Sequence, residues 1–213
     1  MTIISPTVTA CDLHDYRAQM EQAVSFAECV HVDLMDGIFA VTKSPDIETL
    51  WLPTGNIRKD MHVMFQHPFH QLKKLLSLGP DMIIIQVEAD KESVDNFIKH
   101  IKKTRVRLGV ALLAPTRPTD PRVAGLIKKS DYVLIFSGHL GFQGSKADLG
   151  LLSKVSEIKS INPKVEIGWD GGICLENAKK LAEGGVNVLN IGGAIQKSSN
   201  PAESYTKLKE ALA

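Results

Sequence analysis

The sequence lacks an excess of charge of either sign. Lys and Arg together number 25 and Asp and Glu number 24, so the formal net charge is +1 at pH 7. Such a balance provides no field that would attract nucleic acid or an anionic membrane surface. We therefore expect neither nucleic acid nor a membrane as a partner, and any anionic ligand has to be held by local groups.

Cysteine is scarce, and long apolar runs are absent. The three cysteines, Cys11, Cys29 and Cys174, form neither an even disulfide framework nor a zinc-ribbon spacing. No stretch reaches the roughly 18 apolar residues that a membrane helix requires, and the N-terminus lacks the basic start and apolar run of a signal peptide. These features predict an unsecreted, cytoplasmic protein.

The chain also lacks low-complexity segments and Pro/Ser-rich linkers. A chain of 213 residues can bury a large core, and α/β barrels of about this size commonly form one unit. We therefore predict a single domain over residues 1–213.

What is present is an alternation of short β-rich segments with helical patterns, eight of each. This alternation is typical of a parallel sheet with crossover helices, and eight units indicate closure into a (β/α)₈ TIM barrel of the α/β class. Capping and proline signals for helix starts lie at residues 12, 44–45, 120–121 and 200–201. The expected strands cover residues 2–5, 30–34, 58–64, 82–87, 107–112, 132–136, 164–168 and 186–191.

The segment His31-Val32-Asp33 places an imidazole and a carboxylate on one face of an expected strand, because side chains of a strand alternate between its faces. On a buried strand both groups are costly to desolvate unless they pair with something, and a divalent cation would satisfy both. On this segment alone, a structural histidine beside a helix-capping aspartate is an equal alternative.

In such a barrel the catalytic groups lie at the carboxyl ends of strands and in the loops that follow. The other polar residues at these positions are His62, Gln86, Glu88, Ser137, His139 and Asp170. His62 shares a face with Met64, as Asp33 does with Met35, so two thioethers are expected at the same mouth. For both methionines, ordinary core packing is an equal alternative.

Glycine pairs follow three neighbouring strands. Gly171-Gly172 follows Asp170, Gly192-Gly193 follows the last expected strand, and the segment 141–144, Gly-Phe-Gln-Gly, follows the sixth. Glycine frees backbone amides for close approach of a ligand, and the loops after strands seven and eight of such barrels often bind phosphate. Any one pair is also typical of a tight turn, but three at neighbouring strand ends favour a phosphate site.

Five motifs occur in a fixed order along nearly the whole chain. They are His-Val-Asp-Leu-Met-Asp-Gly at 31–37, Asp-Met-His-Val-Met at 60–64, Gly-Val-Ala-Leu at 109–112, Asp-Gly-Gly-Ile at 170–173 and Gly-Gly-Ala-Ile at 192–195. In this order they resemble the ribulose-phosphate 3-epimerase family. The resemblance implies an isomerase of the pentose phosphate pathway that interconverts D-ribulose 5-phosphate and D-xylulose 5-phosphate, and it implies a homo-oligomer.

The resemblance also implies roles for the site residues. His31, Asp33, His62 and Asp170 would hold one divalent metal ion, and Asp33 and Asp170 would also be the catalytic acid/base pair. Two histidines and two carboxylates suit Zn²⁺, Fe²⁺, Mn²⁺ or Co²⁺. One carboxylate would remove the C3 proton to give a metal-stabilised 2,3-enediolate, and the other would return a proton to the opposite face. The expected substrate-binding residues are Thr7, Met35, Met64, Ser137, Gly141, Phe142, Gln143, Gly144, Gly171, Gly172, Gly192 and Gly193.

The chain departs from the family pattern on loops that would face the substrate. Thr7 stands where serine is usual, and Gln86 where histidine is usual. Leu113-Ala114 replaces an asparagine-proline pair, and Phe136 replaces a third methionine before a divergent loop. His139 in that loop would either contact a substrate hydroxyl or face solvent.

These departures leave the sugar open, so an epimerase of another ketose phosphate such as D-allulose 6-phosphate is an alternative. A hexulose-phosphate synthase is disfavoured, because Asp60 is followed by His62 where its Asp-x-Lys pattern requires lysine. The alternative from another class is a barrel that binds a sugar phosphate without turnover, which the fold alone does not exclude.

Overall fold

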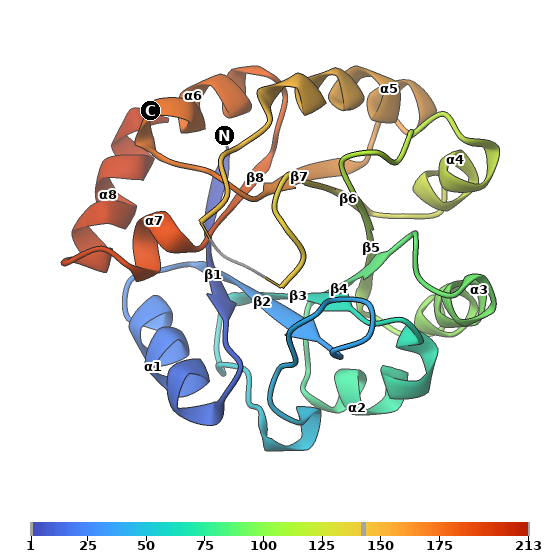
Figure 1. The fold of residues 1–213 in the computed structure, drawn as a ribbon, viewed down its shortest axis with the longest axis horizontal. Coiled ribbons are helices and arrows are strands. Elements are labelled where there is room, and N and C mark those ends of the chain that lie inside the picture. Colours follow the sequence, from blue (N-terminus) through green and yellow to red (C-terminus); the bar gives the residue numbers. More distant parts are fainter. Residues whose placement is uncertain (1, 142–143, 213) are drawn as a thin grey trace.

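Eight parallel strands close into one barrel in sequence order in the computed structural model, which describes residues 2–141 and 144–212 (Figure 1). The barrel closes where β8 pairs with β1, with Ile3 opposite Val188. The predicted (β/α)₈ TIM barrel of the α/β class is confirmed. The strands are β1 (Ile3–Thr9), β2 (Cys29–Met35), β3 (Arg58–Met64), β4 (Met82–Gln86), β5 (Arg107–Leu112), β6 (Tyr132–Phe136), β7 (Glu166–Asp170) and β8 (Val188–Ile191).

The helices form an outer ring around the strands (Figure 1). Within the described residues, no helix combines the length and the apolar character that crossing a membrane requires. The expected starts at Asp12, Asp120 and Asn200 are confirmed, because each of these side chains caps a helix through a backbone N–H. The α-helices are α1 (Leu13–Val24), α2 (Leu72–Ser77), α3 (Lys91–Ile101), α4 (Pro121–Ile127), α5 (Ser153–Ile161), α6 (Leu175–Glu183), α7 (Gly193–Gln196) and α8 (Pro201–Ala211).

The prediction of a helix beginning at Ser44-Pro45 was wrong. Only a single 3₁₀ turn, η1 (Ile47–Thr49), lies between β2 and β3. Pro53 would remove a helical hydrogen bond and would clash with the carbonyl four residues earlier, and proline also disfavours the helical conformation in the residue before it. A helix beginning at Pro45 would therefore have been stopped after about two turns.

Two strands differ from their expected limits in a way that matters for the mouth of the barrel. β1 continues past Pro6 to Thr9, and β7 continues to Asp170 instead of ending at Gly168. Proline removes only one donor from a strand, so it does not end β1. The extensions bring Thr7, Thr9 and Asp170 to the mouth on regular strand backbone.

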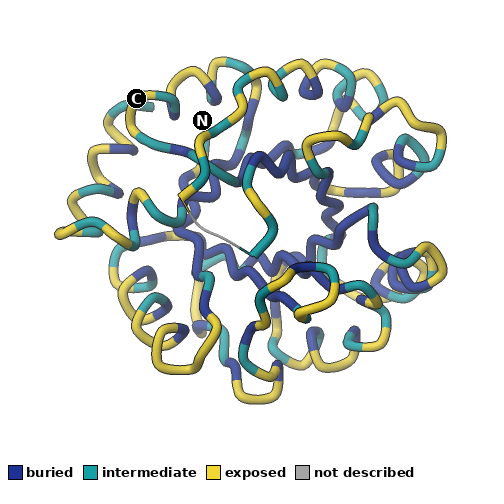
Figure 2. Tube along the Cα trace, viewed as in Figure 1, coloured by how far each residue is buried: buried dark blue, intermediate teal, exposed yellow. Residues whose placement is uncertain are grey.

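The outward and inward faces of the barrel wall differ in polarity. Outward side chains such as Val30, Val32 and Leu34 belong to the large apolar core that lies under the helices, and most strand positions are buried (Figure 2). Inward positions carry buried polar groups, including His62 and Asn190. The barrel therefore places polar chemistry in a water-poor interior.

The N-terminal end of the barrel is closed by an ion network. Arg58, the first residue of β3, donates to both carboxylate oxygens of Glu166 at 2.9 and 3.0 Å and lies 2.8 Å from Asp60. Arg107, the first residue of β5, donates to Glu166 at 2.8 Å. Above this network, Tyr132 fills the barrel, and a Cβ at Gly168 would lie 1.6 Å from its hydroxyl oxygen. Gly168 is therefore required for the close packing of this layer.

The Glu166→Gln variant is expected to change how stability depends on pH. Burial alone would raise the pKa of Glu166, but hydrogen bonds and positive charge from Arg58 and Arg107 outweigh it and hold that pKa below the ordinary value of 4.5. A carboxylate with a depressed pKa contributes stability above the unfolded pKa and loses it as pH falls through the folded pKa.

Urea unfolding at pH 7 and at pH 3.5 provides the measurement. At pH 7 the variant should have a lower free energy of unfolding than the wild type, and the difference should shrink at pH 3.5. Glu183→Gln, which removes an exposed carboxylate, is the control and should show little difference at either pH. A difference for Glu166→Gln that is the same at both pH values would contradict the stabilising role of the ion network.

Candidate active site

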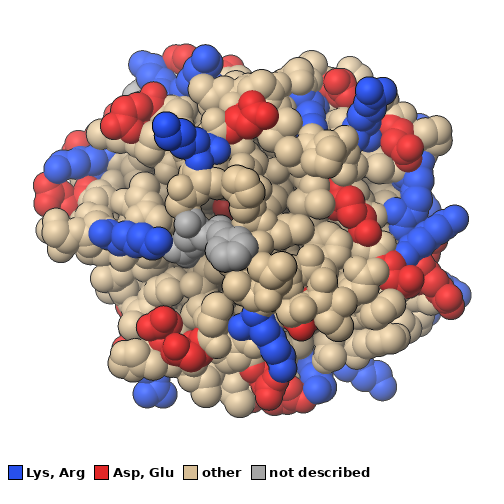
Figure 3. Space-filling model, viewed as in Figure 1, with Lys and Arg blue, Asp and Glu red and all other residues tan. Residues whose placement is uncertain are grey.

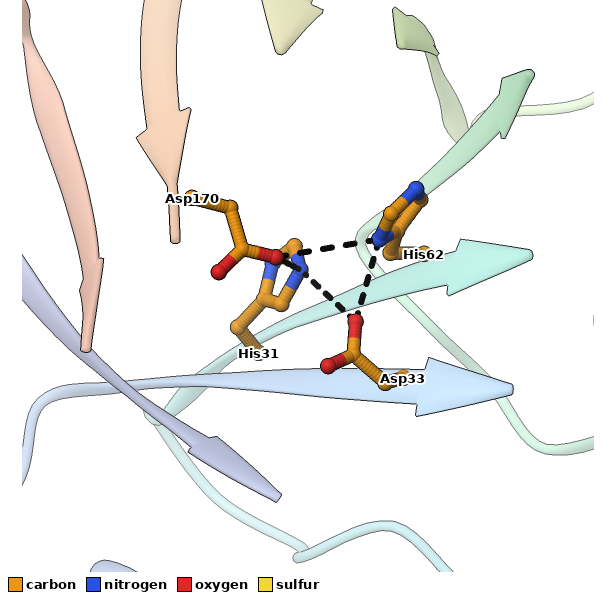
Figure 4. Close-up of side chains that lie close together, drawn as sticks. All are labelled: His31, Asp33, His62 and Asp170. Atoms are coloured by element: carbon orange, nitrogen blue, oxygen red, sulfur yellow. Dashed lines mark hydrogen bonds and ion pairs between the residues drawn. The ribbon is translucent and has the colours of Figure 1, made fainter. Parts of the chain in front are cut away.

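Four polar side chains meet at the mouth of the barrel. His31 and Asp33 lie two residues apart on β2 and therefore share its inward face. His62 of β3 is the register partner of Asp33. Asp170 is the last residue of β7 and reaches the same place from across the barrel (Figure 4). All four are buried.

The donor atoms of this cluster all lie within 4.8 Å of one another. His62 Nδ1 lies 3.0 Å from Asp33 Oδ1 and 3.9 Å from Asp170 Oδ2. His31 Nε2 lies 3.4 Å from Asp33 Oδ1 and 3.8 Å from Asp170 Oδ2. Each carboxylate turns one oxygen toward the rings and the other away from them (Figure 4).

These residues fit a divalent cation. Four ligands about 2.1 Å from a tetrahedral ion are separated from one another by roughly 3.4 Å, and the four nitrogen–oxygen distances given above run from 3.0 to 3.9 Å. Both nitrogens of His31 and Oδ2 of Asp170 are buried without a hydrogen-bond partner among the described residues. Such atoms are costly to bury. A cation would satisfy Asp170 Oδ2 and the ring nitrogen of His31 that faces it.

The environment moves the pKa values of the two carboxylates apart. Burial raises the pKa of Asp170 to about 7, and the nearby charge of Asp33 adds to the effect. Burial would also raise the pKa of Asp33, but His31 and His62 outweigh it and hold that pKa below the ordinary value. A pair whose pKa values are moved apart is typical of acid/base sites. A bound cation would favour the ionised form of both groups.

Thr9 is a site residue that the sequence prediction missed. Its hydroxyl donates to Asp33 Oδ2 at 2.7 Å, and its backbone exchanges two hydrogen bonds with the Gln19 side chain, at 3.0 and 3.1 Å. Thr9 thereby fixes the carboxylate so that Oδ1 faces the histidines. Thr9 could have been found from the alternation of side chains along a strand, because it shares a face with Thr7. That inference required the first strand to continue past Pro6.

A cavity of about 670 Å³ opens above the cluster and includes Asp33 and Asp170 in its walls. This volume is in the range of small-molecule sites. Of the expected substrate-binding residues, those that line it are Thr7, Met35, Met64, Gly141, Gly144, Gly171, Gly172, Gly192 and Gly193. Ser137 does not line it, since its hydroxyl accepts a hydrogen bond from Asp148 N at 2.7 Å. Phe142 and Gln143 lie outside the described residues.

The loops after β6 and β7 pack against each other at one side of this cavity. Gly172 has a φ of +71°, and a Cβ there would lie 2.0 Å from the backbone nitrogen of Ala147. Only glycine allows this approach. The same packing brings backbone from two loops to the cavity wall, next to Gly192-Gly193 at the end of β8.

Two lysines that the prediction did not select also line the cavity. Lys146 and Lys197 are exposed, and the exposed Glu176 lines the same cavity. Lys197 follows the glycine pair at 192–193 by four residues, which was a usable signal. On the face that Figure 3 shows, side chains of both signs are distributed around the rim and neither forms a large patch.

A model of the ribulose-phosphate 3 epimerase family matches residues 3–196. The chloroplastic ribulose-5-phosphate-3-epimerase of Arabidopsis thaliana is 28% identical over 97% of this chain and 76% of its own length. The ribulose-phosphate 3-epimerase of Bacillus subtilis is 28% identical over 86% of each chain.

Among solved structures, 3-keto-L-gulonate-6-phosphate decarboxylase from Vibrio cholerae has a TM-score of 0.74 at 12% identity, covering 99% of this chain and 97% of that chain. At this identity the likeness shows the barrel fold alone.

Proposed function

Because the chain belongs to the ribulose-phosphate 3-epimerase family, we propose that it is a metal-dependent epimerase that interconverts D-ribulose 5-phosphate and D-xylulose 5-phosphate. An epimerase is an isomerase, and the named relatives are of this class. One observation carries the proposal: two carboxylates and two histidines, drawn from three strands, converge below a cavity at the mouth of the barrel.

His31, Asp33, His62 and Asp170 would hold the cation, which we infer to be Zn²⁺, Fe²⁺, Mn²⁺ or Co²⁺ from the mixed nitrogen and oxygen donors. When bound, the cation would polarise the oxygens of the ketose and stabilise the negative charge of a 2,3-enediolate by several kcal/mol. The fully buried His31 and His62 would fix its position.

Asp33 and Asp170 would move the protons. They come from β2 and β7, which belong to different sides of the barrel, and both line the cavity. A ketose between them would present one face of C3 to each carboxylate. One would take the C3 proton and the other would deliver a proton to the opposite face, so inversion needs neither a hydride carrier nor a covalent nucleophile.

The phosphate would lie at the glycine side of the cavity. Gly171-Gly172 and Gly192-Gly193 line the cavity, and Lys146 and Lys197, which line the same cavity, would supply positive charge to the phosphate. This arrangement supports an anionic ligand even though the chain as a whole is nearly neutral. We also infer one domain over residues 1–213, because pairing of β1 with β8 joins the two ends of the chain in one barrel.

A second candidate substrate is another ketose phosphate, such as D-allulose 6-phosphate. The observation that favours it is the wall formed after β6, where His139 and Phe136 line the cavity. A longer sugar would reach this wall, and the exposed imidazole of His139 provides a hydrogen-bonding group for an additional hydroxyl.

A panel of ketose phosphates in D₂O tests the proposal. With bound cation, we expect the protein to incorporate deuterium at C3 of ribulose 5-phosphate and to form xylulose 5-phosphate, which NMR detects directly. Exchange confined to six-carbon substrates would favour the second candidate. No exchange with any substrate, for protein that binds cation, would favour a barrel that binds sugar phosphate without turnover.

A further inference from the structure

The two ring nitrogens of His62 face two different partners. Nδ1 is directed at the carboxylates of the cluster, 3.0 Å from Asp33 Oδ1. Nε2 lies on the far side of the ring, 2.9 Å from the side-chain amide nitrogen of Gln86. Gln86 is the last residue of β4 and is fully buried, and its Oε1 has no hydrogen-bond partner among the described residues.

The observed arrangement matches one tautomer of His62. A neutral imidazole carries one proton, so one ring nitrogen donates and the other accepts. With the proton on Nδ1, the ring donates to Asp33, and Nε2 accepts from the Gln86 amide. A cation held by the cluster would need the lone pair of Nδ1, and the proton would then reside on Nε2, where it would point at the amide NH₂ of Gln86.

This conflict disappears if the amide turns over. Rotation of the Gln86 amide by about a half-turn exchanges its NH₂ for Oε1, which can accept from Nε2–H. Metal-ligating histidines almost always donate their second ring nitrogen to an oxygen acceptor. We propose that Gln86 is a positioning residue that stabilises the tautomer of His62 needed for cation binding, and that its amide turns over when a divalent cation binds.

The packing around His62 favours rotation of the Gln86 amide over movement of the His62 ring. His62 is fully buried, and its ring packs against those of His31 and Phe136, whose centroids lie 5.6 and 5.7 Å away. Glutamine has a donor and an acceptor at one position and no charge, so it can serve both states without adding a third carboxylate beside Asp33 and Asp170. Gln86 does not line the substrate cavity, so its effect on the site passes through His62.

The inference rests on the cation site of the proposed function, and Gln86→Met and Gln86→Glu test it in the full chain. Zn²⁺ or Co²⁺ is titrated into chelator-treated protein and followed by calorimetry. Gln86→Met keeps the length of the side chain but has no donor and only a weakly accepting sulfur, and we expect it to weaken cation binding about 10- to 100-fold. Gln86→Glu keeps an acceptor for Nε2–H and should bind the cation at least as tightly as the wild type.

Ile85→Val is the control, since Ile85 lies next to Gln86 on β4 but belongs to the outer core; its affinity should equal that of the wild type. In ¹⁵N-histidine-labelled wild type, NMR should show the proton of His62 on Nδ1 without cation and on Nε2 with it. A merely structural role for Gln86 would not produce this change.

Gln86→Met with wild-type affinity, or a proton on the same nitrogen in both states, would overturn the role of Gln86 alone. A wild type that binds no divalent cation would overturn the proposed function and this inference together. If Gln86→Met fails to fold, the Glu variant and the NMR of the wild type still decide the question.

Discussion

Replacing Asp170 with asparagine should lower kcat for epimerisation by about 10²- to 10⁴-fold, the usual contribution of a positioned acid or base. The asparagine would keep the shape of the side chain but would have no carboxylate to exchange a proton with C3. Asp33, which comes from a different strand, remains in place and is held by the Thr9 hydroxyl at 2.7 Å. Steady-state kinetics on protein with bound cation measures the loss.

Exchange of the C3 hydrogen distinguishes the roles of Asp33 and Asp170 more clearly than kcat does. In D₂O, Asp170→Asn should still exchange the C3 hydrogen of the one epimer whose proton faces Asp33, without inverting it. Asp33→Asn should exchange only the other epimer. Exchange of both epimers by either variant would contradict a two-base mechanism. Asp95→Asn, an exposed change on α3, should behave like the wild type and serves as the control.

Removal of the cation should abolish turnover and lower the melting temperature. A ligand that binds only the folded state at 1,000 times its Kd adds about 4 kcal/mol to the free energy of unfolding. For a chain of this size each kcal/mol corresponds to about 2–4 °C. We therefore expect a melting temperature roughly 8–16 °C higher with saturating cation than after chelator treatment.

Histidine variants test whether this increase in melting temperature comes from binding at the cluster. His62→Gln should bind the cation weakly and should therefore show little change in melting temperature on its addition. His14→Gln, an exposed change on α1, should show the full change. Wild-type protein whose melting temperature is unaffected by Zn²⁺, Fe²⁺, Mn²⁺ and Co²⁺ would contradict the cation site.

The architecture and the meeting of strand-end polar residues at one mouth were predictable because they follow from periodic rules, whereas the choice of the four ligands among those residues was implied by the resemblance to the family. Alternation along β2 places His31 and Asp33 on one face, and the rule that barrel strands present their carboxyl ends at one mouth brings Asp170 to the same place. These rules depend on backbone period and topology, which local sequence patterns determine. They do not depend on the particular rotamer of any side chain.

The contacts that were not predicted depend on details that cannot be read from the periodicity of the sequence. The contact between Gln86 and His62 requires particular rotamers on two neighbouring strands, and the Thr9 hydrogen bond requires the extra length of β1. Ser137 was expected at the substrate, but the path of the loop after β6 directs its hydroxyl to Asp148. Loop paths depend on distant packing, such as that of Gly172 against Ala147.

The ion network of Arg58, Arg107 and Glu166 has a consequence for the engineering of this barrel. It occupies the first residues of β3, β5 and β7, whereas Asp170 stands at the last residue of β7, at the opposite end of the same strand. The residues that stabilise the N-terminal end of the barrel are thus separate from the residues at the mouth, where the reaction would take place. The substrate specificity can therefore be redesigned by changing the loop after β6 around His139 without altering the ion network.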